Sequence, residues 1–335
     1  MRDAVVPVSR RPVWNTKTMT SRYGITIPFE GVTLLEHRAW FHRLADLGYT
    51  DVWSSEVDGA DGFTPLVLAA AWEPRLNLGV AVTPVFTRGA GLLAMSIAAL
   101  SEVAPGRFTM GLGSSSEPVV QRWNGVAYDK PYARTRDVLR FVQRALDGEK
   151  IDEVFETFEV HGFKLSRPVA SRPPILLGAL RPGMLRLAGR EADGAILNWL
   201  GAEDVATCRA EVGDDKTIAA RLFVVPTEDT DLARFVGRRM ISSYLTVNAY
   251  AEFHRWLGRG DALGPMWEAW AQGDRKLANE LIPDSVVDDL IIHGSYQQCR
   301  EHVQRYVDAG VQIPTLAVIP VGGDLSDIVE GLAPR

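Results

Sequence analysis

The sequence predicts an α/β fold, a (β/α)8 TIM barrel of eight parallel strands with helices between them, and three observations lead to it. Eight short apolar segments with strand character occur along the chain with helical segments between them, which is the pattern of a parallel sheet. The third of these segments is apolar on both faces, as a buried parallel strand should be. The length of 335 residues also lies within the range of a single α/β barrel.

The expected elements follow one another in order. Apolar runs predict strands at 23–29, 51–57, 76–86, 107–113, 174–179, 195–199, 219–226 and 315–321. Helical spacing of apolar residues predicts helices at 34–48, 65–72, 91–104, 133–146, 182–192, 205–212 and 296–309. Gly148 follows the fourth helix, where a helix terminator belongs, and Pro182 opens the fifth.

Two stretches interrupt this alternation. The run at 154–165 has the pattern of a small hairpin inserted before strand five. The region at 231–281 is helical and free of strands, and it forms an insertion between strands seven and eight. Its tryptophans, Trp256, Trp267 and Trp270, indicate a lid over the barrel mouth, a subunit interface, or a satellite core beneath the insertion.

The first 20 residues differ from the rest of the chain. They combine four basic residues with one acidic residue and two prolines, and they have no sustained apolar period. This composition predicts an extended N-terminal tail at 1–20 and a single barrel domain at 21–335. Met19 is the more natural start of the protein on this interpretation.

Composition argues against several classes of function. A net charge of -6 at pH 7 provides no basic face for nucleic acid. Cys208 and Cys299 are the only cysteines and lack metal-type spacing, so we expect neither a disulfide framework nor a zinc site, and a reducing cytoplasm suits them. The six histidines likewise lack metal-binding spacing, so no metal is expected. No apolar run reaches the roughly 18 residues that a membrane-spanning helix needs.

A glycine- and serine-rich stretch follows the fourth expected strand. Gly113 leads into Ser114, Ser115 and Ser116, and Pro118 lies in the first turn of an expected helix. Free backbone N–H groups at such a helix start can hold an anion, so the stretch predicts a phosphate cradle. The alternative is that the serines only cap the helix.

A second loop of this kind follows strand five. Gly178 permits close backbone approach, Ala179 and Leu180 continue the loop, and Arg181 supplies positive charge just before the helix that Pro182 opens. In a barrel the fourth and fifth loops are neighbours at the C-terminal rim, so both helix starts would face one anion. Arg181 could equally be a solvated loop arginine.

Other polar residues end strands at the same rim. Glu56 ends strand two and Asp61 follows it, so these carboxylates are the candidates for acid, base or orienting roles. The alternative for them is a structural ion pair with a barrel arginine. Asn198 and Trp199 end strand six and offer an amide and a ring to a planar ligand, although Trp199 also suits simple packing. Thr83 ends strand three, where backbone distortion beside a ligand would be useful.

Taken together, these segments resemble the luciferase-like monooxygenase superfamily, and within it the oxidoreductases that depend on coenzyme F420, a 5-deazaflavin. The resemblance runs from about Tyr23 to Pro320, and its order and spacing are specific. The segments that carry it are LGYTDVWSSE, LNLGVAVTPVFTRG, APGRFTMGLGSSSEPVVQRWNG, PPILLGALRPGMLRLAGREADGAILNW and the AG-V-PTLAVIP ending.

The resemblance implies a TIM barrel that binds the deazaflavin in its C-terminal cavity and transfers a hydride to or from C5 of the cofactor. It implies a non-prolyl cis peptide near Val80-Ala81, just before Thr83, that supports the ring. The loops at 114–116 and 178–181 would hold the phosphate and ribityl chain. The family also suggests a homodimer.

One departure from the family pattern concerns the proton donor. In the sugar-phosphate dehydrogenase branch a histidine next to the strand-two carboxylate acts as base, whereas Val57 follows Glu56 here. Ser116 stands where that branch has a carboxylate, although Glu117 is adjacent. Sugar-phosphate oxidation is therefore disfavoured, and Glu56 or Asp61 remains as the proton donor.

The sequence thus predicts an F420-dependent oxidoreductase of unknown small organic substrate. An FMN-dependent luciferase-like monooxygenase, using reduced flavin and oxygen, is the main alternative. A non-catalytic flavin- or deazaflavin-binding protein is a third interpretation. A phosphate-binding barrel enzyme of sugar metabolism without a redox cofactor is a fourth.

Overall fold

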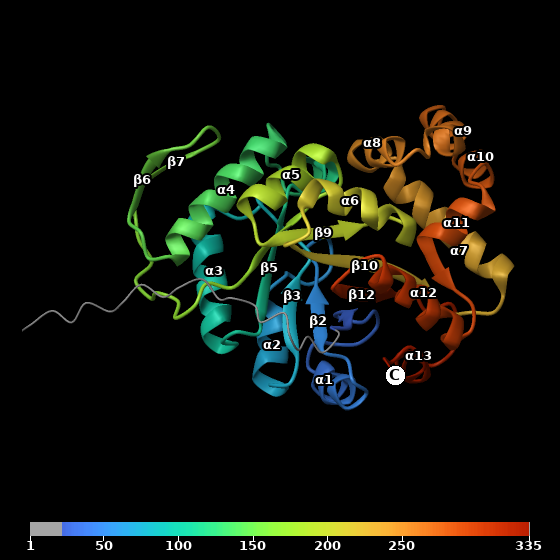
Figure 1. Ribbon diagram of the computed structural model, residues 1–335, viewed down its shortest axis with the longest axis horizontal. Helices are drawn as coiled ribbons and strands as arrows, with labels where there is room; N and C mark the ends of the chain where they lie inside the picture. The colour runs from blue at the N-terminus through green and yellow to red at the C-terminus, as the bar shows by residue number, and fades with distance from the viewer. Residues whose placement is uncertain (1–21, 335) are drawn as a thin grey trace, which may run out of the picture.

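The computed structural model describes residues 22–334, and its centre is a closed barrel of eight parallel strands (Figure 1). In order around the ring the strands are β1 (Gly24–Thr26), β2 (Asp51–Ser54), β3 (Asn77–Val80), β5 (Phe108–Gly113), β8 (Ile175–Gly178), β9 (Gly194–Asn198), β10 (Thr217–Val225) and β12 (Ile313–Val318). The ring closes because β12 pairs in parallel with both β10 and β1. The predicted TIM barrel is therefore confirmed. The predicted tail at 1–20 and the suggested start at Met19 lie outside the described residues.

Helices surround the barrel, as Figure 1 shows. They are α1 (His37–Asp46), α2 (Thr64–Trp72), α3 (Ala90–Val103), α4 (Pro131–Leu146), α5 (Pro182–Glu191), α6 (Val205–Val212), α12 (Tyr296–Asp308) and α13 (Leu325–Gly331), with short turns at Pro118–Trp123 and Ala202–Asp204. Alternate strand residues pack outward against these helices, which explains the continuous apolar runs in the sequence. None of the helices between residues 22 and 334 is long and apolar enough to cross a lipid bilayer.

The inward-facing residues form a small core of their own. It consists of Trp53, Leu176, Ile196, Ala219 and Ile313, with Ala81 and Val82 packed against it. Trp53 takes so much of the space that its neighbour on β3 must be glycine, since a Cβ on Gly79 would lie 2.3 Å from the Trp53 ring. This part of the barrel interior is therefore filled around one tryptophan, rather than by regular layers of branched side chains.

The third predicted strand is interrupted within the barrel. β3 ends at Val80, and the short strand β4 (Thr83–Pro84) resumes pairing with β5. A non-prolyl cis peptide joins Ala81 to Val82 between them. The expected position, Val80-Ala81, is wrong by one residue, because Val80 still pairs with Ser54 of β2 and the chain leaves the ladder only after it.

The predicted hairpin exists but begins earlier than expected. It consists of the antiparallel strands β6 (Ile151–Val154) and β7 (Glu159–Phe163), so the boundaries 154–165 were wrong. Phe155 and Phe158 lie in the turn, and their rings stack with centroids 4.7 Å apart.

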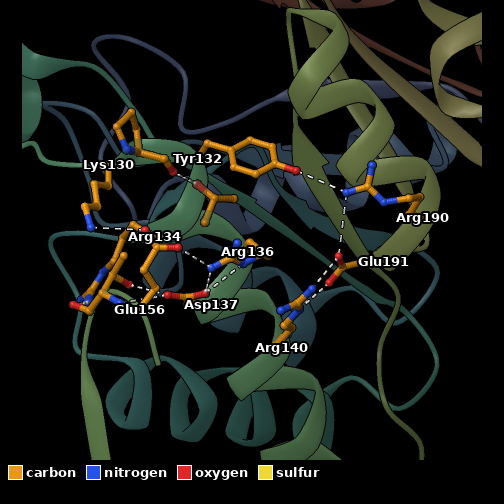
Figure 2. Close-up of polar contacts among 12 residues, drawn as sticks. Lys130, Tyr132, Arg134, Arg136, Asp137, Arg140, Glu156, Arg190 and Glu191 are labelled. Carbon is orange, nitrogen blue, oxygen red and sulfur yellow. Dashed lines mark hydrogen bonds and ion pairs between the residues drawn. The ribbon is translucent and has the colours of Figure 1, made fainter. Parts of the chain in front are cut away.

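Polar contacts anchor this hairpin to α4 (Figure 2). The buried Asp137 carboxylate accepts hydrogen bonds from the Thr157 N–H at 3.0 Å and the Thr157 hydroxyl at 2.9 Å. Glu156 in the same turn pairs with Arg136 and Lys130. The hairpin therefore packs on the outside of the barrel through α4, away from the strands themselves.

The helical insertion after β10 is confirmed and has its own core. It contains α7 (Thr230–Leu245), α8 (Asn248–Trp256), α9 (Gly260–Ala271), α10 (Arg275–Glu280) and α11 (Asp284–Leu290), and it ends in β11 (Ile291–His293), which pairs with the end of β10. Trp267 and Trp270 pack against a cluster that also includes Trp199 and Phe223 of the barrel. These two tryptophans therefore belong to a satellite core, one of the three interpretations of the sequence.

Candidate active site

The two predicted rim loops are neighbours. They follow β5 and β8, which pair in parallel through Met110 with Ile175 and Leu112 with Leu177. The loops therefore leave the same end of adjacent strands, where the active sites of such barrels lie.

The serine loop differs from the expected helix start. A single π-helical turn, Pro118–Trp123, follows it, and the long helix α4 begins only at Pro131. Pro118 does lie in the first turn of a helical element, as predicted, but this element is π-helical and only six residues long. An anion here would therefore depend on local donors, with little contribution from a helix dipole.

Those local donors are present. Ser115 adopts a left-handed backbone conformation with φ of 58°, and the Tyr128 hydroxyl donates to its carbonyl at 3.1 Å. Ser114, Ser115 and Ser116 are partly exposed. Within residues 22–334, the backbone N–H groups of Ser115 and Ser116 donate to no protein acceptor. The Ser114 hydroxyl donates to the Ser115 carbonyl at 3.3 Å, so the two N–H groups and the hydroxyls of Ser115 and Ser116 are the groups left for a ligand.

In the second loop, Arg181 is the residue open to solvent. Ala179 is buried and donates its N–H to the Ile196 carbonyl, so it continues the sheet, and Leu180 packs against the main core. Arg181 is exposed and lies immediately before α5. Of the residues that were predicted at 179–181, Arg181 is the one suited to meet an anion from solvent.

Gly113 and Gly178 make room for the residue that follows the cis peptide. A Cβ on Gly113 would lie 2.6 Å from Val82 Cγ2, and one on Gly178 would lie 3.0 Å from Val82 Cγ1. The two glycines thus let Val82 cross the upper end of the barrel interior. Thr83 is buried beside this point, and its hydroxyl has no partner within the described chain.

Glu56 forms the ion pair that the sequence left as an alternative. Its carboxylate accepts from Arg88 Nη2 at 2.9 Å and from the Gly62 N–H at 3.0 Å. Arg88 comes from the loop after β4 and also lies over the Phe63 ring at 4.9 Å. Sequence reasoning missed Arg88 as the partner, although it lies within the segment LNLGVAVTPVFTRG.

Asp61 has a mainly structural position. It accepts hydrogen bonds from the backbone N–H groups of Phe63 and Thr64, at 2.9 and 3.1 Å, where α2 begins. Burial disfavours its ionised form, but hydrogen bonds from Thr64 and Phe63, together with the charge of Arg88, hold its pKa below the usual value. A carboxyl group that stays ionised at neutral pH is poorly suited to donate a proton.

Asn198 and Trp199 have different environments. Asn198 Nδ2 donates to the Tyr250 hydroxyl of α8 at 3.2 Å, and its Oδ1 is buried without a partner in the described chain. Trp199 is buried and stacks on Phe223 with ring centroids 4.1 Å apart. Trp199 is therefore a packing residue, whereas Asn198 retains a free acceptor.

A small cavity lies within the barrel next to Ala81. Its volume is about 10 Å³, the room of roughly one water molecule. The lining residues are Thr26, Trp53, Ser54, Ser55, Ala81, Ile196, Ala219, Ala220, Arg221 and Thr315. Sequence reasoning missed Arg221, and the available signal was a lone arginine inside the apolar run AARLFVVP.

Among residues 22–334, no group of three or more His, Cys, Asp or Glu side chains is arranged to hold a metal ion.

Known proteins share both the sequence pattern and the fold. A coenzyme F420-dependent oxidoreductase of Mycobacterium tuberculosis is 26% identical over 83% of this chain and 88% of its own length. The 5,10-methylenetetrahydromethanopterin reductase of Methanolobus tindarius is 26% identical over 88% of this chain and 93% of its own. The structure of the F420-dependent tetrahydromethanopterin reductase of Methanopyrus kandleri superposes with a TM-score of 0.76 at 19% identity, covering 93% of this chain and 97% of that one.

The family pattern extends over most of the chain. The family described as luciferase-like monooxygenase matches residues 17–312, which include every barrel strand except β12. The chain belongs to the luciferase-like monooxygenase family.

Proposed function

We propose that this protein is an F420-dependent oxidoreductase that transfers a hydride between the deazaflavin and a small organic molecule. The observation that carries the proposal is the pairing of two adjacent rim loops with free donors, beside a distorted strand, at the end of the barrel where such enzymes bind their ligands. The relatives described above support it, because their names specify F420 or a reductase reaction.

The donor set fits a phosphorylated cofactor. The free N–H groups and hydroxyls of Ser115 and Ser116, together with the exposed Arg181, would hold its phosphate and ribityl chain. When bound, the deazaflavin would supply a carbon, C5, that gives or accepts a hydride. The enclosed cavity is far smaller than a tricyclic ring, so the ring would bind outside it, and Val82 would be among the residues that hold it.

Glu56 is the stronger of the two candidate acid–base residues. Its side chain lies at the end of β2, and Arg88 holds it in place. Asp61 instead caps α2 and keeps a lowered pKa. We propose that Glu56, oriented by Arg88, handles the proton of the reaction, and that Asp61 is its structural neighbour.

The test separates F420 from FMN. Incubation of the purified protein with each cofactor should produce binding of F420, seen in its absorption and fluorescence, with negligible binding of FMN. Turnover coupled to oxygen uptake in the presence of FMN would instead assign the protein to the flavin monooxygenases. Cofactor binding without hydride transfer to any tested substrate would favour the non-catalytic alternative.

The remaining proposals concern assembly and compartment. A row of exposed apolar side chains, Leu92, Met95 and Val103, follows one face of α3, and we propose that a second copy of the chain covers it in a homodimer. Met95→Glu should then yield a monomer in sedimentation, whereas Val154→Glu on the hairpin should not.

The buried thiols of Cys208 and Cys299 suit a reducing cytoplasm.

A further inference from the structure

We propose that Arg221 binds a planar oxyanion of the substrate, a carboxylate or an enolate oxygen, at the floor of the site. Arg221 lies on β10, level with Asn198 of β9 and Thr315 of β12, and its side chain lines the internal cavity. This inference rests on the proposed function, because it names the substrate class for the same end of the barrel.

The charge of Arg221 has no counter-charge. In the described part of the chain its guanidinium forms neither an ion pair nor a hydrogen bond, and its Nε is shielded from solvent. Burial lowers the pKa of Arg221. The titratable groups that oppose this shift are Tyr244 and Tyr250. Arg221 as a whole is half-buried, and a partly desolvated cation costs free energy unless acceptors or an anion surround it. The missing partner is therefore expected to come from a ligand.

Three further polar atoms in the same cavity lack partners within residues 22–334. They are Trp53 Nε1, Thr26 Oγ1 and Thr315 Oγ1. The Trp53 indole and Arg221 Nε can only donate, and the two hydroxyls can donate or accept. No Asp or Glu of the described chain lines the cavity. This set fits an acceptor with several lone pairs and a negative charge, and it fits neither a cation nor an apolar group.

The size of the cavity limits what enters it. A volume of about 10 Å³ has room for one oxygen-sized group, so the rest of the substrate would extend toward the barrel mouth. The Phe223 ring, with its centroid 5.1 Å from the Arg221 guanidinium carbon, covers the guanidinium as in a cation–π contact. The remaining donors of Arg221 are then available for a planar oxyanion, which a guanidinium recognises well.

Sodium acetate, with acetamide as the uncharged isostere, is the probe that tests this assignment. The full-length protein without cofactor is labelled with 15N at tryptophan, and the indole resonances are followed during titration. We expect acetate to shift the Trp53 indole resonance saturably and acetamide not to shift it. Arg221→Met should weaken acetate binding by at least about tenfold.

The matched control is Arg239→Met, because Arg239 also lies over a phenylalanine ring but is exposed. It should titrate with acetate as the wild type does. Arg221→Gln replaces Arg221→Met if the methionine variant does not fold. An unchanged acetate titration in the folded Arg221 variant, equal shifts with acetamide, or no acetate shift in the wild type would overturn the proposal.

A separate titration with F420 identifies the source of the oxyanion. Arg221→Met should keep its affinity for F420, followed by deazaflavin fluorescence. A loss of F420 affinity without any change in acetate binding would assign Arg221 to the cofactor and overturn the substrate assignment. Because the acetate experiment contains no cofactor, a failure to bind F420 would contradict the proposed function and leave the acetate result intact.

Discussion

At the scale of single residues, the clearest constraint is the contact between Val82 and two inward-facing glycines. Val82 follows the cis peptide, and its two methyl groups lie against Gly113 and Gly178 on neighbouring strands. Valine is stiff at χ1, so it cannot move easily to admit a new side chain. The sequence predicted these glycines as cofactor-binding residues, and the structure adds a packing reason for them.

Gly113→Ala should therefore lower stability more than Gly178→Ala. The added Cβ would lie 2.6 Å from Val82 in the first variant and 3.0 Å in the second. We expect a loss of about 1–3 kcal/mol for Gly113→Ala, measured by urea denaturation, because overpacking in a filled interior forces neighbours to shift. Gly183→Ala is the control, since nothing lies within 4 Å of its added Cβ. Equal stability of the Gly113 and Gly183 variants would contradict this packing role.

Two arginines, Arg88 and Arg221, have roles that the sequence could not predict. Glu56 was predicted from its place after strand two, but its partner Arg88 is 32 positions further along the chain. Arg221 lies in an apolar run that predicts only a buried strand. The Glu56–Arg88 pair and the unpartnered Arg221 arise only when the barrel closes. The local spacing of apolar residues carries no information about them.

At the scale of elements, the start of α2 depends on Asp61. Two backbone N–H groups donate to its carboxylate, and Arg88 lies 3.5 Å away. These contacts lower the pKa of Asp61 in the folded protein. The stabilisation is therefore complete above its unfolded pKa of about 4 and is lost as the pH falls through the lower folded value.

Asp61→Ala should cost about 1 kcal/mol of unfolding free energy at pH 7, the usual effect of losing an N-terminal cap. The difference from the wild type should shrink as the pH falls below about 4, because Asp61 of the unfolded wild type takes up a proton there while its folded carboxylate stays ionised to lower pH. Urea denaturation at pH 7 and at pH 3 measures both. A cost that is the same at both pH values would mean that the charge of Asp61 contributes nothing.

The hairpin shows why element boundaries were harder to predict than element types. The run at 154–165 predicted a hairpin, but residues near its start, Phe155 and Phe158, lie in the turn, where the two rings pack on Phe141 of α4. Likewise, Pro118 predicted a helix that ends after one turn. In the hairpin, packing of these rings on α4, rather than local preference, accompanies the shifted boundary.

Asp137→Ala should release the hairpin turn while leaving the barrel folded. The variant loses both hydrogen bonds from Thr157, and Arg136 loses one of its two carboxylate partners (Figure 2). We expect faster proteolysis at the turn with little change in the main thermal transition, because the hairpin strands pair only with each other. The control is Glu149→Ala, which removes an exposed ion pair between Glu149 and Arg144 of α4. Cleavage at the wild-type rate would show that Asp137 does not hold the turn.

At the scale of the whole molecule, the barrel was predictable because its strands need apolar residues on both faces. The inward residues pack around Trp53, and the outward ones pack against the helices, so all eight strands appear as apolar runs. The helical insertion was predictable from the absence of strand patterns, but its core with Trp199 and Phe223 was not. That core links the insertion to the strands that carry Asn198 and Arg221.

The central claim is that the adjacent loops after β5 and β8 hold F420, and its most direct test is a fluorescence titration of F420 against two proteins. One is the wild type, and the other carries Ser115→Leu and Ser116→Leu, which place bulky apolar groups over the free N–H groups. The account predicts saturable binding to the wild type and at least about a hundredfold weaker binding to the folded variant. Undiminished affinity of the variant would contradict it and return the serine loop to a purely structural role.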